Sequence, residues 1–156
     1  MSGICEGRVV IVTGAGGGLG AAHARVLAAE GAAVIVNDIN QDAAQAVVDS
    51  IVASGGRAVV NESDITNYAS SELAVRQAID TFGDLHGVVN NAGNNRDRMF
   101  ASLSEADWDA VMAVHLKGHF CIASHAVQYW RHQSKAGNSV SGRILNTTSG
   151  AGLQGS

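Results

Sequence analysis

The sequence contains no proline, and only 4% of its 156 residues are aromatic. Turns must therefore be built from glycine, Asn and Asp, and glycine is abundant, with 19 residues. The scarcity of aromatic side chains argues against a surface that stacks nucleic-acid bases. Only two cysteines occur, Cys5 and Cys121, without a CxxC pair or a metal-ligand pattern. This usage is typical of a reduced, cytoplasmic protein.

Basic residues are also few: 10 Lys and Arg stand against 14 Asp and Glu, a net charge of −4. Nucleic acid and anionic membranes bind clustered basic residues, so neither is an expected partner. No apolar run approaches the ~18 residues of a membrane span, and residues 1–7 lack the features of a secretion signal. The remaining composition, 46% hydrophobic and 15% charged, predicts one globular domain over residues 1–156.

Short β-branched runs alternate with longer helical stretches along the chain. This alternation predicts an α/β fold of the Rossmann type, a doubly wound parallel sheet that stops after its fifth strand. The expected strands are Arg8–Thr13, Ala33–Asn37, Arg57–Asn61, Leu85–Asn90 and Arg143–Thr148. Helices are expected from Leu19 to Glu30, over Gln41–Ala53 and Ser70–Phe82, and from Ser104 to about Arg131, where Ser104 and Asp107 resemble a capping box.

A glycine-rich segment, Thr13–Gly20 (TGAGGGLG), lies between the first strand and the first helix. In this context Gly14 permits a tight turn, Gly18 lets the backbone approach a pyrophosphate, and Gly20 allows close packing of helix on strand. The helix that begins at Leu19 then points free N–H groups at the phosphates. The segment therefore predicts a dinucleotide site. The alternative is a glycine-rich turn without a ligand.

An acidic residue, Asp38, follows Gly18 at the end of the second strand. A carboxylate there bonds the adenosine ribose hydroxyls and repels a 2′-phosphate. The loop residues between Gly14 and Gly18 include no Lys or Arg to receive such a phosphate, so we expect the cofactor to be NAD. The alternative is that Asp38 simply caps the helix that starts near Gln41.

Four motifs in order resemble the short-chain dehydrogenase/reductase family. They are the TGxxxGxG spacing, NNAG at Asn90–Gly93, the pair Asp64 and Ile65, and RILNTTSGAGLQG at Arg143–Gly155. The resemblance covers nearly the whole chain and implies hydride transfer between NAD and a secondary alcohol or ketone. It also implies which residues line the cofactor site: Gly14, Gly18, Leu19, Gly20, Asp38, Asp64, Ile65 and Asn91.

Three further runs are similar to the dehydrogenase unit of peroxisomal multifunctional enzymes of type 2 and their bacterial relatives. These are VNDI at Val36–Ile39, NNRDRMF at Asn94–Phe100 and VHLKGHF at Val114–Phe120. This similarity implies 3-hydroxyacyl-CoA or steroid-like substrates. Because the long helix commonly packs in a subunit interface of this family, it also implies a homo-oligomer.

The resemblance assigns two residues to the reaction. Ser149 stands at the position of the serine that holds the reacting oxygen, and the alternative is a hydroxyl that closes a turn. His115 stands where the family often has an Asn in a proton relay, and the alternative is a histidine that only packs. His115 and His119 are four residues apart, but no HExxH glutamate accompanies them, so we expect no metal.

The sequence lacks the family's tyrosine with a lysine four residues later. Tyr68 is followed at that spacing by Glu72, and Tyr129 by Gln133. We therefore expect these 156 residues to be inactive alone, and the gene to continue with such a pair shortly after Ser156. A non-catalytic NAD-binding sensor or regulatory module is the alternative function.

Overall fold

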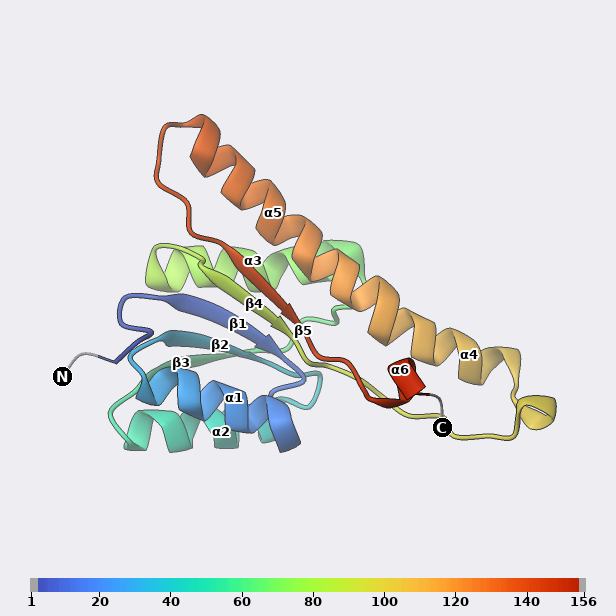
Figure 1. The fold of residues 1–156 in the computed structure, drawn as a ribbon. Helices are drawn as coiled ribbons and strands as arrows, with labels where there is room; N and C mark the ends of the chain where they lie inside the picture. The colour runs from blue at the N-terminus through green and yellow to red at the C-terminus, as the bar shows by residue number, and fades with distance from the viewer. Residues whose placement is uncertain (1–2, 155–156) are drawn as a thin grey trace.

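A computed structural model of the chain describes residues 3–154 and contains a five-stranded parallel sheet in the order β3-β2-β1-β4-β5 (Figure 1). Ile11 of β1 pairs with Ile35 of β2 on one side and with Val88 of β4 on the other. The chain thus winds outward in two directions from β1, and the crevice between such halves is where dinucleotides bind. The strands are β1 (Val9–Thr13), β2 (Ala33–Asn37), β3 (Arg57–Asn61), β4 (Gly87–Asn90) and β5 (Arg143–Asn146).

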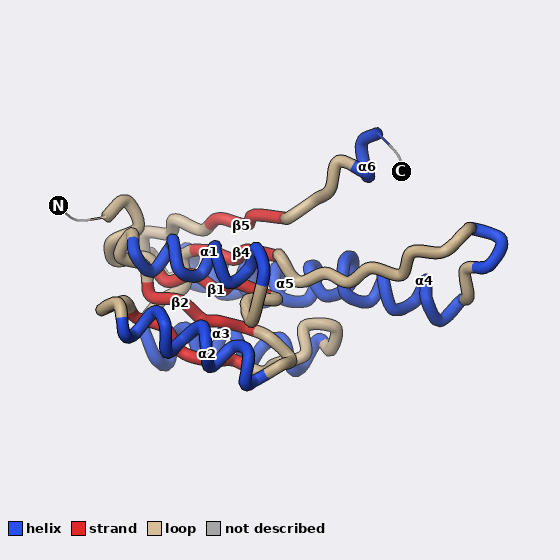
Figure 2. Tube along the Cα trace, turned by 90° about the horizontal axis from the view of Figure 1, so that it is seen from below, coloured by secondary structure: helices blue, strands red, loops and turns tan. Residues whose placement is uncertain are grey.

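Helices cover both faces of the sheet, which confirms the doubly wound fold (Figures 1 and 2). One core forms beneath α1 (Gly18–Ala29) and α2 (Gln41–Ala53), and the other beneath α3 (Tyr68–Phe82) and α5 (His119–Lys135). Every residue of β1 and β2 is buried, because parallel strands covered on both faces expose neither row of side chains.

The predicted strands and helices are all present. β2, β3 and α2 have the predicted ends, and the ends of the others are shifted. β5 ends at Asn146, two residues earlier than expected, and a short helix, α6 (Ala151–Gln154), follows it without having been predicted. α3 begins at Tyr68 because the side chain of Asn67 caps it, accepting the Ser70 N–H at 3.0 Å.

The long helix differs most from its prediction. A short turn, η1 (Phe100–Ser102), precedes α4 (Glu105–Met112), and the helix then takes π geometry over η2 (Ala113–Gly118) before α5 continues to Lys135. The expected single α-helix is therefore wrong at its centre. Its start is confirmed, since Ser104 Oγ accepts the Asp107 N–H at 3.1 Å. No helix within residues 3–154 combines the length and apolar character needed to cross a membrane.

Candidate functional site

The glycine-rich turn after β1 has no room for side chains at two of its positions. Gly14 has a φ of +61°, and a Cβ on it would lie 2.7 Å from the Cα of Ala92. A Cβ on Gly20 would overlap the carbonyl oxygen of Gly14. At Gly18 the space is open, but a φ of +51° still favours glycine. The turn therefore brings bare backbone to the start of α1, as the sequence predicts.

Asp38 lies beside this turn at the end of β2. Its Oδ2 accepts the Gly16 N–H at 2.9 Å, and its Oδ1 accepts the Asn40 N–H at 2.9 Å. The cap of α2 is Asn40, whose side chain accepts the Ala43 N–H at 3.1 Å. The alternative role of Asp38 as that cap is therefore wrong. Its carboxylate instead joins the glycine turn to the end of β2.

A cavity of about 430 Å³ opens at the carboxyl ends of the strands. Gly14, Asp38, Asp64 and Ile65, four of the residues expected at the cofactor site, line it. Ile65 is buried and offers an apolar wall, while Asp64 Oδ1 accepts the Thr66 N–H at 2.8 Å and shapes the loop after β3. An apolar wall with a few convergent polar groups is typical of small-molecule binding pockets.

Buried amides support the floor of this cavity. Asn37 donates to Asn61 Oδ1 at 2.7 Å and to the Ser63 carbonyl at 2.9 Å. Asn61 in turn donates to Gln77 Oε1 at 2.8 Å, which ties the end of β3 to α3. The sequence analysis missed this network, although the polar ends of two otherwise apolar strands signal it.

The side chain of Asn91 binds the glycine turn and does not line the cavity. Its amide donates to the carbonyls of Thr13 and Gly14 at 3.1 and 3.2 Å. Thr13 Oγ1 accepts hydrogen bonds from the N–H groups of Asn91 and Ala92, at 3.1 and 3.0 Å. These bonds fasten the NNAG segment to the glycine turn. Thr13 is a site residue for which the sequence analysis proposed no role.

The two histidines of the long helix contact the same segment from the other side. His115, in the π-helical η2, has Nε2 2.7 Å from the Asn94 carbonyl, and His119 Nε2 lies 3.1 Å from the Ala92 carbonyl. Their ring centroids are 6.3 Å apart. Within residues 3–154 no group of three or more His, Cys, Asp or Glu is arranged to hold a metal ion.

Ser149 is exposed in the segment after β5 and lies outside the set of residues that line the cavity. Its Oγ accepts the Ala151 N–H at 3.2 Å, at the start of α6. The structure thus brings Gly14, Asp38, Asp64 and Ile65 to one cavity, leaves the Leu19 side chain exposed on α1, and does not bring Ser149 to them.

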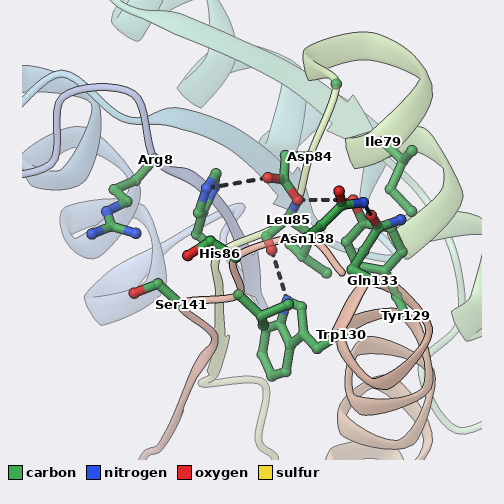
Figure 3. Close-up of a pocket in the computed structure, with 13 residues that line it drawn as sticks. Arg8, Ile79, Asp84, Leu85, His86, Tyr129, Trp130, Gln133, Asn138 and Ser141 are labelled. Atoms are coloured by element: carbon green, nitrogen blue, oxygen red, sulfur yellow. Dashed lines mark hydrogen bonds and ion pairs between the residues drawn. The ribbon is translucent and has the colours of Figure 1, made fainter. Parts of the chain in front are cut away.

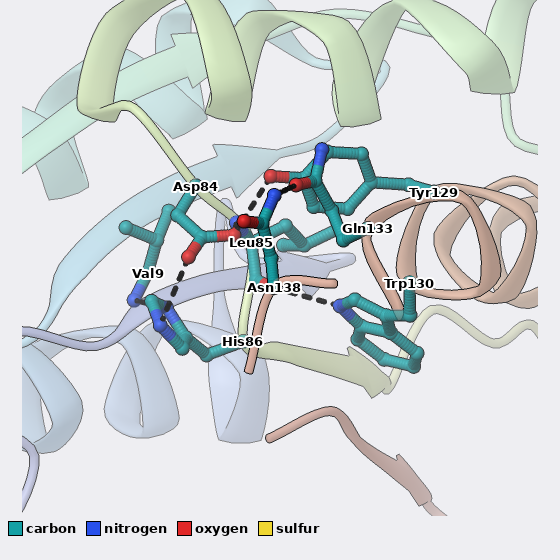
Figure 4. Close-up of polar contacts among 8 residues, drawn as sticks. All are labelled: Val9, Asp84, Leu85, His86, Tyr129, Trp130, Gln133 and Asn138. Carbon is teal, nitrogen blue, oxygen red and sulfur yellow. Dashed lines mark hydrogen bonds and ion pairs between the residues drawn. The ribbon is translucent and has the colours of Figure 1, made fainter. Parts of the chain in front are cut away.

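A larger cavity, about 540 Å³, lies at the opposite edge, where the strands begin (Figure 3). Its side chains bind one another: Tyr129 donates to Asp84 Oδ1 at 2.8 Å, His86 Nε2 lies 3.4 Å from Asp84 Oδ2, and Trp130 donates to the Leu85 carbonyl at 2.7 Å (Figure 4). Val9 donates its N–H to His86 Nδ1 at 3.1 Å. We call Asp84, His86, Tyr129 and Trp130 the amino-edge cluster. It joins α5 to the starts of β1 and β4.

Burial, together with the bonded Asp84 carboxylate, raises the pKa of Tyr129 to about 12. A phenol held neutral in this way is a poor general base near neutral pH. The Tyr129 hydroxyl therefore serves the amino-edge cluster as a neutral hydrogen-bond donor.

Known proteins resemble the chain over nearly all of its length. The family model described as short chain dehydrogenase matches residues 8–156. Hydroxyacyl-CoA dehydrogenase ChsB1 of Mycobacterium tuberculosis is 47% identical over 96% of this chain and 49% of its own length. Peroxisomal multifunctional enzyme type 2 of Mus musculus is 45% identical over 96% of this chain and 20% of its own.

A solved short chain dehydrogenase from Mycobacterium avium superposes with a TM-score of 0.96 at 56% identity, covering 99% of this chain and 56% of that one. The chain thus spans about half the length of ChsB1 and of this solved dehydrogenase.

Proposed function

The chain belongs to the short-chain dehydrogenase family, and on that basis we propose that it forms the NAD-binding half of an oxidoreductase. The reaction is hydride transfer between NAD and a secondary alcohol or ketone, with 3-hydroxyacyl-CoA as the substrate class. The observation that carries the proposal is the carboxylate of Asp38, held 2.9 Å from the Gly16 N–H at the mouth of the glycine turn. The names of the relatives ChsB1 and multifunctional enzyme type 2 support the acyl-CoA class.

The residues present fit such a cofactor. The turn, where a Cβ at Gly14 or Gly20 would meet neighbouring backbone, accommodates a pyrophosphate at the N-terminus of the 12-residue helix α1, whose first turn carries no acidic residue. Asp38 accepts from the adenosine ribose, and Asp64 with Ile65 flanks the adenine. Without a basic residue in the turn, a 2′-phosphate meets only the Asp38 carboxylate, which favours NAD over NADP. NAD supplies the hydride acceptor when bound.

Two residues of this chain act at the reacting oxygen in the proposed reaction. Ser149 donates a hydrogen bond to that oxygen, and His115 takes part in moving its proton. Neither tyrosine stands in the family's Tyr–Lys pattern, and Tyr129 lies at the opposite edge. We therefore expect residues 1–156 alone to bind NAD without turning over an alcohol.

The test is the NAD-linked oxidation of a 3-hydroxyacyl-CoA by a full-length protein that contains this chain, followed by the absorbance of the reduced nicotinamide. Ser149→Ala should lower turnover by ~10²-fold, the scale of a lost oriented donor, and leave NAD affinity unchanged. Ser139→Ala, at the amino edge, is the matched control. Unchanged turnover in Ser149→Ala would refute its role. A protein that binds NAD and oxidises no alcohol would favour the regulatory module.

We further propose a homo-oligomer and a cytoplasmic location. Trp108, Leu116 and Phe120 of the long helix are 54–62% exposed, which supports a second copy as their cover. Both cysteines are free and lie in different elements, which fits a reducing compartment. Light scattering of the purified protein tests the first proposal, and Phe120→Glu should shift the mass toward the monomer.

A further inference from the structure

The loop that follows β4 contacts the long helix where its geometry changes from α to π. In both Figure 1 and Figure 2 this loop runs alongside α4 before the chain turns back into it. His115 lies within η2, the π-helical segment Ala113–Gly118. Such segments are rare in proteins and are frequent at functional sites. The loop residue Asn94 contacts His115 within this segment and Ala110 just before it.

The main chain of Asn94 contacts the ring of His115. His115 Nε2 lies 2.7 Å from the Asn94 carbonyl oxygen, and the Asn94 N–H also points at Nε2, at 3.0 Å, so the two contacts require opposite states of this nitrogen. A ring nitrogen is either a donor or an acceptor, and the shorter contact is to the carbonyl, which only accepts. A lone pair on Nε2 would face the lone pairs of that oxygen at 2.7 Å. The arrangement therefore favours a proton on Nε2 and leaves Nδ1 of the neutral ring as the free acceptor.

The side chain of Asn94 binds the same helix one turn earlier. Its Nδ2 donates to the Ala110 carbonyl at 3.1 Å, just before the π-helical segment begins. Its Oδ1 is buried and has no hydrogen-bond partner among residues 3–154. A buried unpaired oxygen lowers the stability of the fold. The orientation of the Asn94 amide that binds Ala110 therefore has a cost in stability.

The ring of His115 also lies against the backbone of Gly93. A Cβ on Gly93 would be 2.7 Å from His115 Cε1. Ring and loop are therefore in direct contact, and a displacement of the loop displaces the ring.

We propose that Asn94 is the positioning residue for His115. Its side chain fixes the loop to α4, and its carbonyl then holds the imidazole with the proton on Nε2 and with Nδ1 as the acceptor. Its importance for turnover rests on the proposed function of His115, whereas its effect on the ring does not.

The direct test is the tautomer of His115, read from long-range proton–nitrogen NMR correlations of the ¹⁵N-histidine-labelled chain. We expect the proton on Nε2 in the wild type and a mixture of tautomers in Asn94→Ala. Asn94→Asp, which has the same shape but cannot donate to Ala110, should give the same mixture and serves if the alanine variant does not fold. Asn95→Ala is the control, because the Asn95 side chain bonds Asp97 in the exposed part of the loop.

In the full-length protein, Asn94→Asp should lower kcat about tenfold or more with KM unchanged, as misplacement of a reacting group does. A proton on Nδ1 in the wild type, or an unchanged tautomer in both Asn94 variants, would overturn the proposal. If His115→Ala leaves kcat unchanged while the Asn94 variants still change the tautomer, the positioning role stands and the proposed function of His115 fails.

Discussion

At the amino ends of the strands, side chains from separate elements satisfy one another. Asp84 accepts from Tyr129 and from the Leu85 N–H, and Trp130 donates to a neighbouring carbonyl. At the carboxyl ends, Asp38 bonds only main-chain N–H groups, and the buried oxygens Asn90 Oδ1 and Asn94 Oδ1 have no partner within residues 3–154. Both edges contain cavities, about 540 Å³ at the amino edge and about 430 Å³ beside the glycine turn.

The comparison distinguishes a cluster of side chains that stabilises the fold from a group of residues that binds a ligand. A carboxylate and a histidine in a cavity suggest chemistry, but at the amino edge their hydrogen bonds hold helix and strands together. At the carboxyl edge the chain keeps backbone bare and polar atoms unpaired, arrangements that cost stability and are retained where a ligand binds. Changes at the carboxyl edge should therefore alter binding, and changes at the amino edge should alter only stability.

The largest effect is expected from Gly20→Val. Its Cβ would overlap the Gly14 carbonyl, and the overpacking should cost about 3 kcal/mol of the free energy of unfolding and abolish NAD binding. Urea denaturation measures the free energy of unfolding, and calorimetric titration measures the affinity for NAD. Gly17→Ala, in the same turn with open space around its Cβ, is the stability control. Normal NAD affinity in Gly20→Val would show that the turn does not form the site.

Asp84→Ala should have an intermediate effect. It leaves the Tyr129 hydroxyl and the Leu85 N–H without their acceptor, which should cost about 2 kcal/mol of the free energy of unfolding. NAD affinity, measured on the folded variant, should stay at the wild-type value. A large fall in that affinity would contradict the division between the two edges.

Tyr129→Phe should cost about 1 kcal/mol near neutral pH, the net value of one hydrogen bond. Folding raises the pKa of Tyr129 from about 10 in the unfolded chain to about 12. The contribution of the neutral phenol to the free energy of unfolding is therefore fully present below pH 10 and is lost as the pH rises toward 12. The variant's deficit should therefore shrink over that range in urea denaturation series. A deficit that is constant from pH 9 to pH 12 would show that the phenol is not held neutral by the fold.

The fold was predictable because its signals are local. Continuous apolar runs identify β1 and β2, and Ser104 with Asp107 identifies the start of α4. The geometry of the glycine turn was predictable for the same reason, since glycine at Gly14 and Gly20 reflects steric limits within one turn. The role of Asp38 needed the structure, because two main-chain donors distinguish it from the Asn40 cap.

The features that escaped the sequence analysis depend on contacts between distant segments. The π-helical segment that contains His115 follows Ala110. The Ala110 carbonyl accepts a hydrogen bond from the side chain of Asn94, which lies 16 residues earlier in the chain. The amino-edge cluster joins Asp84 to Tyr129 across 45 residues. Neither contact leaves a periodic or compositional signal that a single sequence reveals.

We propose that the carboxyl edge binds NAD through Asp38. The most direct measurement is a calorimetric titration of this chain with NAD and with NADP, for the wild type and for Asp38→Asn. Asn removes the charge and keeps one oxygen, so one of the two N–H groups, of Gly16 or of Asn40, retains its acceptor. We predict that the wild type prefers NAD, and that Asp38→Asn narrows the preference by roughly 1–3 kcal/mol, the scale of a charge-assisted hydrogen bond. Equal or tighter binding of NADP by the wild type would contradict the proposal that the Asp38 carboxylate selects NAD.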